Sequence, residues 1–216
     1  MARRTKDAAL ATRDNILDAA EIVFEQRGVS RCSLQEVAQA AGVTRGAIYW
    51  HFENKADLTN AMFKRVTLPL EAQIHRSADP GLADPLLEVR NSLLNALRTT
   101  MTDPQVQRVF TIATQKVEYV DELLAVRERR VNTRNGCLQH VEIGIKRAMA
   151  AGRIDRRVPA STVAVGLHAL VDGLIINWLL DPTAFDLVKV GTQAIDAYLG
   201  GLALKAPAGG ATRART

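Results

Sequence analysis

The sequence predicts an all-α protein of about nine helices, with no credible strand. Apolar residues make up 47% and charged residues 24% of its 216 positions, which is typical of a globular chain that can bury a sizeable core. Aromatic residues make up only 5%, which favours packed helices over a sheet. The apolar positions recur at helical spacing between Gly, Pro and capping residues, so we expect helices joined by short turns.

Two helices are predicted at the N-terminal end. Residues 12–27 carry one apolar stripe, which predicts an amphipathic first helix that stops at Gly28. Ser33 and Glu36 have the spacing of a capping box, in which each side chain satisfies a backbone N–H at the helix start. This pair predicts a short second helix, which Gly42 ends.

A tight turn and a third short helix follow. Thr44 is a capping residue ahead of a segment that keeps Ile48 and Phe52 on one side. Two short helices around a Gly-containing turn have the shape of a helix-turn-helix, whose second helix can enter a DNA groove. Asn54 then caps a fourth helix over residues 55–74.

The fifth to seventh helices are delimited by two Asp-Pro pairs. Asp84 and Asp103 each precede a proline, which places a capping Asp before Pro at the first helical position. These pairs predict helices over residues 86–101 and from residue 105 onward. The pattern stays helical over residues 105–151, with a division near Tyr119 that separates the sixth helix from the seventh.

The eighth helix is predicted from an almost continuously apolar segment, residues 163–180, which has nearly the length of a membrane span. A mid-membrane Asp such as Asp172 costs about 2.5 to 3.5 kcal/mol, so we expect a buried helix of a soluble protein and no membrane partner. Such a helix is too apolar to face water. This segment and a final amphipathic helix over residues 188–202 predict a homodimer whose interface contains four helices, two from each subunit. The alternative is a large monomeric core.

These elements predict two domains and a tail. Residues 1–54 form a DNA-binding domain that begins with a loose basic arm over residues 1–11, and residues 55–204 form a ligand-binding and dimerisation domain. Residues 205–216 lack apolar periodicity, so we expect a disordered tail. The net charge of +5 permits an anionic partner without requiring one, because the excess is thinly spread.

The cysteines and histidines disfavour several classes of site. Cys32 and Cys137 lie in separate segments without the spacing of zinc sites, redox pairs or disulfides, so we expect a cytoplasmic chain that needs no metal and no cofactor. No apolar signal segment opens the sequence, which favours the same compartment. An enzyme is the main rival class, but no nucleophile with a base and no cluster of ligands appears. The four scattered histidines are His51, His75, His140 and His168.

The surface of the third predicted helix favours DNA as the partner. Helical geometry places Gly46 and Trp50 opposite the inward-turned apolar residues. Gly46 leaves room for the helix to sit deep in a major groove, where Arg45 can reach guanine O6 and N7. Neighbouring side chains can donate to phosphates, and Lys55 is expected at an exposed helix N-terminus that favours anions. The predicted DNA-binding residues are Ser33, Thr44, Arg45, Gly46, Ala47, Tyr49, Trp50, His51 and Lys55.

This segment resembles the signature of the TetR family of transcriptional regulators. The resemblance spans residues 12–62 and is carried by Gly42-Val43-Thr44-Arg45-Gly46-Ala47-Ile48-Tyr49-Trp50-His51-Phe52 with Lys55 and Leu58, and by Ile16-Leu17-Asp18-Ala19-Ala20 with Phe24. A looser resemblance is to the branch that represses multidrug-efflux genes. It is carried by Arg3-Arg4-Thr5-Lys6, Lys116, Glu118, Val171-Asp172-Gly173-Leu174-Ile175 and Trp178.

The resemblance implies a homodimeric repressor of two-domain subunits, whose two recognition helices enter successive major grooves of a palindromic DNA operator. It also implies release from the operator by a small lipophilic inducer, such as a drug, dye or antibiotic. By position in the efflux-repressor branch, the candidate ligand-binding residues are Val66, Leu93, Phe110, Thr114, Cys137, Val141, His168 and Val171. The alternative is a regulator of a metabolic or stress gene that answers to a metabolite or to oxidation of Cys137.

Overall fold

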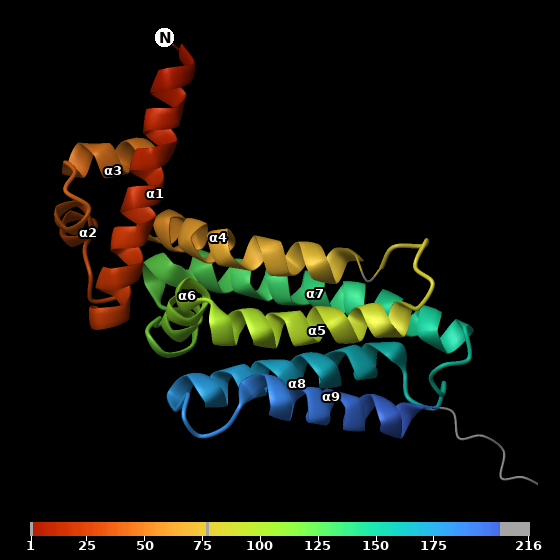
Figure 1. Cartoon of the computed structure of the whole chain (residues 1–216). Helices are drawn as coiled ribbons and strands as arrows, with labels where there is room; N and C mark the ends of the chain where they lie inside the picture. Colours follow the sequence, from red (N-terminus) through yellow and green to blue (C-terminus); the bar gives the residue numbers. More distant parts are fainter. Residues whose placement is uncertain (1, 77, 204–216) are drawn as a thin grey trace, which may run out of the picture.

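The computed structural model describes residues 2–76 and 78–203, and only the backbone at residues 2–5 and 121. Over these ranges it confirms the all-α fold, with nine α-helices and no strand (Figure 1). The predicted disordered tail, residues 205–216, lies outside the described residues. The helices are α1 (Ala2–Arg27), α2 (Leu34–Ala40), α3 (Arg45–His51), α4 (Lys55–Arg76), α5 (Pro85–Thr102), α6 (Pro104–Gln115), α7 (Leu124–Ala150), α8 (Ala160–Leu180) and α9 (Leu187–Leu202), with a 3-10 turn η1 (Asp121–Leu123).

The first helix is longer than predicted, because the expected loose arm is helical. Helix α1 starts at Ala2, and its first turns project beyond α3 (Figure 1). Residues 2–27 contain neither Gly nor Pro, so nothing in the chain stops the helix from extending toward the N-terminus. Gly28 ends the helix with a φ of 84°, the left-handed conformation that favours glycine.

The starts of α4, α5 and α6 follow the predicted caps. At the start of α4, the Asn54 side-chain oxygen accepts a hydrogen bond from the Asp57 N–H at 2.9 Å. Asp84 accepts from the Leu87 N–H at 3.0 Å. Asp103 accepts from the Gln105 N–H at 2.8 Å. Local capping chemistry therefore sets the starts of α4, α5 and α6.

Two apolar clusters hold the helices together. The head cluster comprises buried residues of α1, α2 and α3 together with residues of α4, α6 and the start of α7. The body cluster comprises buried residues of α5, α7, α8 and α9. Phe110 of α6 packs against both clusters. Helices α1 to α3 consequently form a head that is fixed to one end of the body by α4 and α6 (Figure 1).

Helix α8 has the length and composition of a membrane span, yet one of its faces is core. Val163, Leu167 and Ile175 on that face are buried in the body cluster. On the outer face, Val165 is 54% and Leu180 is 67% exposed. The described chain thus buries one side of α8 and leaves apolar residues of the other side, among them Val165 and Leu180, facing outward.

Close packing of α9 against α5 depends on a glycine. A Cβ at Gly191 would overlap the Cδ1 atom of Leu97, a side chain that is fully buried and cannot swing into solvent. A Cβ at Gly136 of α7 would meet nothing within 4 Å. The same substitution should therefore have opposite effects at the two positions.

We expect Gly191→Ala to lower the free energy of unfolding by about 1–2 kcal/mol, because overpacking outweighs the gain in helix propensity. Gly136→Ala should raise it by about 0.5–1 kcal/mol, because only the propensity gain remains. Urea unfolding followed by circular dichroism measures both values. Equal changes in the two variants would contradict the packing described for Gly191.

Candidate nucleic-acid interface

Hydrogen bonds fix the start of α2 and the turn that joins α2 to α3. Ser33 Oγ accepts from the Glu36 N–H at 3.3 Å, and the Ser33 N–H donates to Glu36 Oε2 at 2.8 Å, which confirms the capping box. The Ser33 N–H and the Ser33 hydroxyl, the latter at 2.9 Å, both donate to Glu36 Oε2 and lower the pKa of the Glu36 carboxyl. Gly42 adopts a φ of 66°, and the Asn15 side chain of α1 donates to Ala41 O at 2.7 Å. The orientation of α3 is thereby tied to α1.

Helix α3 presents the two faces that the sequence predicts. Thr44 Oγ1 caps it by accepting from the Ala47 N–H at 3.2 Å. Ile48 and Phe52 are buried in the head cluster. Gly46 is exposed on the opposite face, and Trp50 is 73% exposed there. The orientation of the helix is confirmed, whereas its contact with DNA stays a prediction.

Arg45 and Tyr49 form one exposed unit at the start of α3. Arg45 Nη2 donates to the Tyr49 hydroxyl at 3.2 Å, and the guanidinium lies 5.4 Å from the centre of the tyrosine ring. Both side chains are one helical turn apart, so the contact aligns the arginine along the helix surface. A guanidinium held in this way keeps donors free for a base edge or a phosphate.

The end of α3 carries a cation that the sequence analysis missed. The Arg13 guanidinium of α1 lies 5.0 Å from the centre of the Phe52 ring. Partial burial, with a smaller effect of Arg13, lowers the pKa of His51, so its imidazole is uncharged at neutral pH. Trp50 packs edge-on against His51, with ring centres 4.6 Å apart. Arg13 precedes Ile16 and Leu17 by about one helical turn and so lies on the face of the apolar stripe, which was the signal available.

The prediction of an exposed Lys55 is wrong. Its side chain is 9% exposed, and its ammonium donates to Ser30 O at 3.2 Å and to Cys32 O at 3.0 Å. Glu122 completes the site with an ion pair at 2.6 Å. The segment before α2 and the turn before α7 bring these acceptors to the start of α4. The ammonium therefore fastens the head to the body and is not presented on the surface of α3.

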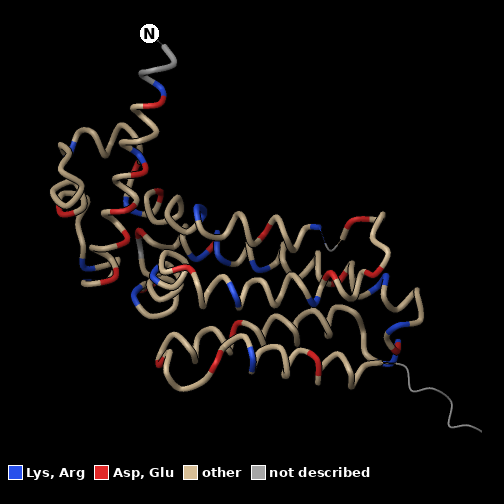
Figure 2. Tube along the Cα trace, viewed as in Figure 1, with Lys and Arg blue, Asp and Glu red and all other residues tan. Residues whose placement is uncertain are grey.

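Charge alone does not mark the interface. Figure 2 shows Lys and Arg interspersed with Asp and Glu over the head and α4 to α7, and almost absent from α8 and α9, rather than gathered on one face. The case for nucleic acid rests instead on the shape and chemistry of α3, where a glycine, an arginine and two aromatic side chains share an exposed face.

The residues predicted to line a ligand pocket come from five consecutive helices, α4 to α8. Leu93, Val141 and Val171 belong to the body cluster, against which Phe110 packs. Val66 belongs to the head cluster, which Phe110 also contacts. Four predicted residues, including Phe110, thus lie in or against the body cluster, and Phe110 links that cluster to the one that contains Val66. Their role in ligand binding stays a prediction.

The three polar candidates are half-buried. The Thr114 hydroxyl donates to the backbone of its own helix at 2.8 Å. Burial, with a smaller effect of Glu71, raises the pKa of the Cys137 thiol to about 11, so the thiol is protonated at neutral pH. Burial lowers the pKa of His168, although the Asp172 carboxylate acts in the opposite direction. The Cys137 and His168 side chains are therefore uncharged at neutral pH.

An open groove of about 420 Å³ lies between α4, α5 and α6. Val66 lines it together with polar residues that include Arg65, Gln73 and Gln105, whereas the other seven predicted ligand residues do not. Its lining residues Arg65 and Gln105 also contact Glu21 of α1. In the described part of the chain, no three His, Cys, Asp or Glu side chains form a group that could hold a metal ion.

Two family profiles match the chain. The profile of the tetR family of bacterial regulatory proteins matches residues 16–62, which contain α2 and α3. The profile of the C-terminal region of MAATS-type transcriptional repressors matches residues 84–204. The second match alone covers more than half of the chain.

Individual proteins are similar over nearly the whole length. The chain is 36% identical over 199 residues to the HTH-type transcriptional regulator TtgR of Pseudomonas putida, covering 92% of this chain and 95% of that protein. The structure of NalD, the secondary repressor of the MexAB-OprM multidrug efflux pump in Pseudomonas aeruginosa, has a TM-score of 0.84 and 34% identity, over 93% of this chain and 100% of that one.

A third similar structure contains a small molecule. The SmeT-triclosan complex has a TM-score of 0.83 and 28% identity, and the similarity covers 90% of this chain and 93% of that one. SmeT is the repressor of the Stenotrophomonas maltophilia multidrug efflux pump SmeDEF. TtgR, NalD and SmeT are all transcriptional regulators rather than enzymes.

Proposed function

The chain belongs to the TetR family of bacterial regulatory proteins and is a DNA-binding transcriptional repressor, and from this premise we propose that it represses a multidrug-efflux operon until a small lipophilic compound binds. The observation that carries the DNA-binding part is the exposed face of α3, where Gly46 lies beside Arg45 and Trp50. The efflux part is supported by the similarity to NalD and SmeT, which repress efflux pumps.

The proposed DNA contacts follow from the faces of α3. Gly46 allows the helix to lie deep in a major groove, and Arg45 at its first turn can bond bidentately to a guanine. Tyr49 and Trp50 are exposed and can donate to phosphates, while the buried Ile48 keeps the helix on its scaffold. The repressor would act on the chromosome in the cytoplasm.

A homodimer is proposed from the outer face of α8. Val165 and Leu180 are exposed there, and Ala169 lies between them at helical spacing. Gly173 has open space where a Cβ would stand, which leaves room for a second helix. Gly166 instead packs closely against Tyr198 of α9, so it serves the contact between α8 and α9 within one subunit. Closed two-fold symmetry would cover this apolar face and pair two heads with a palindrome.

The proposed inducer site centres on Phe110, where the two apolar clusters meet. Val141 and Val171 provide apolar surface, while Thr114 and the uncharged His168 provide polar groups. Apolar walls with a few polar groups are typical of sites for small lipophilic molecules. The SmeT-triclosan complex supports a ligand of this class.

The alternative of a redox sensor at Cys137 is disfavoured by the environment of the thiol. Oxidation proceeds through the thiolate, and sensor cysteines have a lowered pKa and are accessible. The Cys137 side chain is half-buried, and burial raises the pKa of its thiol to about 11. A metabolite as inducer is the remaining alternative, and a ligand screen distinguishes it from a drug-like compound.

Arg45→Ala should weaken binding to a DNA duplex that the wild-type chain has selected from a random library. Because one bidentate base contact is lost, we expect a fall in affinity of about 10- to 100-fold. Fluorescence anisotropy measures it, with the exposed Arg98→Ala on α5 as the matched control. If the affinity for the selected duplex and the preference over random DNA stay unchanged, α3 is not the recognition helix.

Val165→Glu should convert the protein from dimer to monomer, because it would bury a carboxylate in the proposed apolar interface. Sedimentation should give twice the chain mass of 23.6 kDa for the wild type and the single mass for the variant. Gln139→Glu, exposed on α7, is the control and should leave the dimer intact. A wild type that sediments as a monomer contradicts the interface.

A thermal-shift screen with triclosan, cationic dyes and common metabolites should identify the inducer class. A ligand at 100 times its dissociation constant adds about 2.7 kcal/mol to the free energy of unfolding. We expect a lipophilic compound to raise the melting temperature of the wild type. Phe110→Ala should abolish that rise, and Leu87→Ala, exposed on α5, should retain it. A shift with metabolites alone rules out the efflux-inducer proposal.

A further inference from the structure

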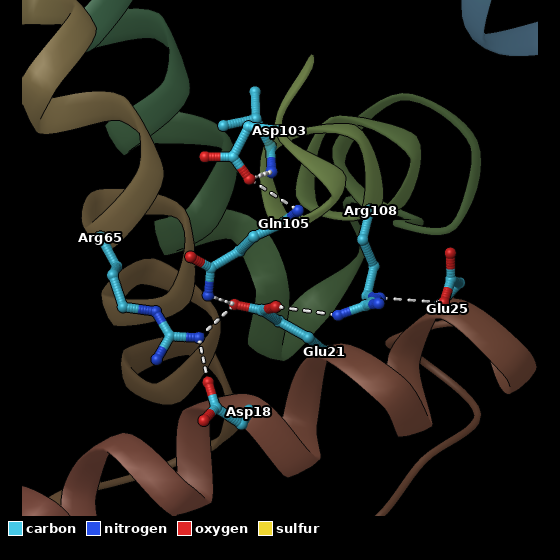
Figure 3. A network of polar contacts seen from close by, with 8 residues as sticks. Asp18, Glu21, Glu25, Arg65, Asp103, Gln105 and Arg108 are labelled. Atoms are coloured by element: carbon cyan, nitrogen blue, oxygen red, sulfur yellow. Dashed lines mark hydrogen bonds and ion pairs between the residues drawn. The ribbon is translucent and has the colours of Figure 1, made fainter. Parts of the chain in front are cut away.

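A buried carboxylate joins three helices at the junction of head and body. Glu21 of α1 is 1% exposed. Its Oε1 accepts hydrogen bonds from Arg65 of α4 and, at 3.0 Å, from Gln105 of α6. Its Oε2 lies 3.5 Å from the Arg108 guanidinium of α6 (Figure 3). One side chain of the head thus holds α4 and α6 at the same time.

Stability alone is a poor reason for such a group. Burying an ionised carboxylate costs several kcal/mol, and replacing a buried ion pair by apolar side chains is often neutral or stabilising. What a shared carboxylate does provide is geometry, because its two oxygens are satisfied only when both arginines and the amide converge. Glu21 therefore fixes one relative placement of α1, α4 and α6.

Each arginine also has an outer acceptor on α1. Arg65 pairs with Asp18 at 2.7 Å, and Arg108 donates to Glu25 at 3.2 Å (Figure 3). Asp18 and Glu25 are 62% and 44% exposed, and they lie about one turn before and after Glu21. An arginine that moves away from Glu21 can remain paired on the surface. The ion pairs with Asp18 and Glu25 thus allow the arginines to move away from Glu21, whereas the Glu21 carboxylate opposes that movement.

Helix α6 reaches both the head and the proposed inducer site. Arg108 lies two residues before Phe110, which packs against the body cluster, so the two side chains leave the helix in different directions. At the far end of α6, Lys116 O accepts from the Val29 N–H of the head at 2.9 Å. A displacement of Phe110 must therefore pull on the head at both ends of α6.

Helix α4 has a weak point beside the same network. Pro69 lies inside α4 and has no N–H to donate to the carbonyl of Arg65, four residues earlier. Bending at a proline is the common way for a long helix to change direction. The arginine that α4 contributes to Glu21 thus sits at the turn where that helix yields most easily.

We propose that Glu21 is a positioning residue that sets the angle of the DNA-binding head on the body, and thereby the spacing of the two recognition helices in the dimer. This inference rests on the proposed function. An inducer at Phe110 would move α6 relative to α4, and Glu21 could then no longer satisfy the partners from both helices. The head would lose its fixed angle while the outer ion pairs hold it to the body.

The test uses the full-length chain and the operator that the wild type selects from random duplexes. Inserting or deleting one base pair between the half-sites rotates them by roughly 35° and shifts them by about 3.4 Å. We expect the wild type to lose about 30-fold or more in affinity on either change, because its heads are held at one spacing. On the same spacing changes, Glu21→Gln should lose only about fivefold in affinity. Its affinity for the selected operator should be about tenfold below that of the wild type, and its affinity for random DNA should be unchanged.

Two control variants separate positioning from structure. Asp18→Asn and Glu25→Gln remove the exposed acceptors of the same arginines, and both should keep the spacing preference of the wild type. A merely stabilising role of Glu21 would lower the melting temperature without changing that preference. If Glu21→Gln does not fold, Arg108→Gln removes the α6 partner instead and should relax the preference in the same way.

The outcomes distinguish this inference from the function on which it rests. If the wild type selects no sequence, the repressor proposal itself fails. If the wild type selects a palindrome but Glu21→Gln or Arg108→Gln discriminates spacing as strongly as the wild type, only the positioning role of Glu21 is overturned.

Discussion

Burial of the Glu21 carboxylate constrains the junction on which the rest of the structure depends. A charge at 1% exposure has to be surrounded by donors, and here they come from α4 and α6. Apolar packing also holds α6 against α1, because Val106, Val109 and Ile112 of α6 lie in the same core as the buried residues of α1. Head and body are therefore joined by a shared apolar core with a polar clamp beside it, and neither is a free module on a linker.

Helix α3, the proposed DNA-binding helix, inherits its position from that junction. Helices α2 and α3 have seven residues each, which is too short for a helix to be stable alone in water. They persist because Ile48 and Phe52 are buried and because caps and the Asn15 hydrogen bond fix their ends. The exposed face of α3 is consequently as rigid as the core behind it. The proposed reading of two half-sites at a fixed spacing needs this rigidity.

Much of the architecture could be predicted from the sequence because the deciding interactions are local. The capping box of Ser33 and the Asp-Pro pairs act within three residues, so they marked helix starts that the structure confirms. The same reasoning failed for residues 2–11, where a basic composition suggested a loose arm and the absence of any helix breaker decided otherwise. It failed again at Lys55, whose acceptors include Ser30 and Glu122 from other segments.

The sequence by itself determined the number of α-helices in the described residues, the caps of α2 to α6 and the inward and outward faces of α3, because periodicity and capping act between neighbours in the chain. The tertiary structure alone decided which side chains meet at the junction. Glu21 stands on the apolar stripe of α1, between Leu17 and Phe24, and that position was the only sequence signal of its burial. Its partners Arg65 and Gln105 lie 44 and 84 residues away. No spacing rule reaches so far, since only the packing of α4 and α6 on α1 brings these groups within hydrogen-bond distance.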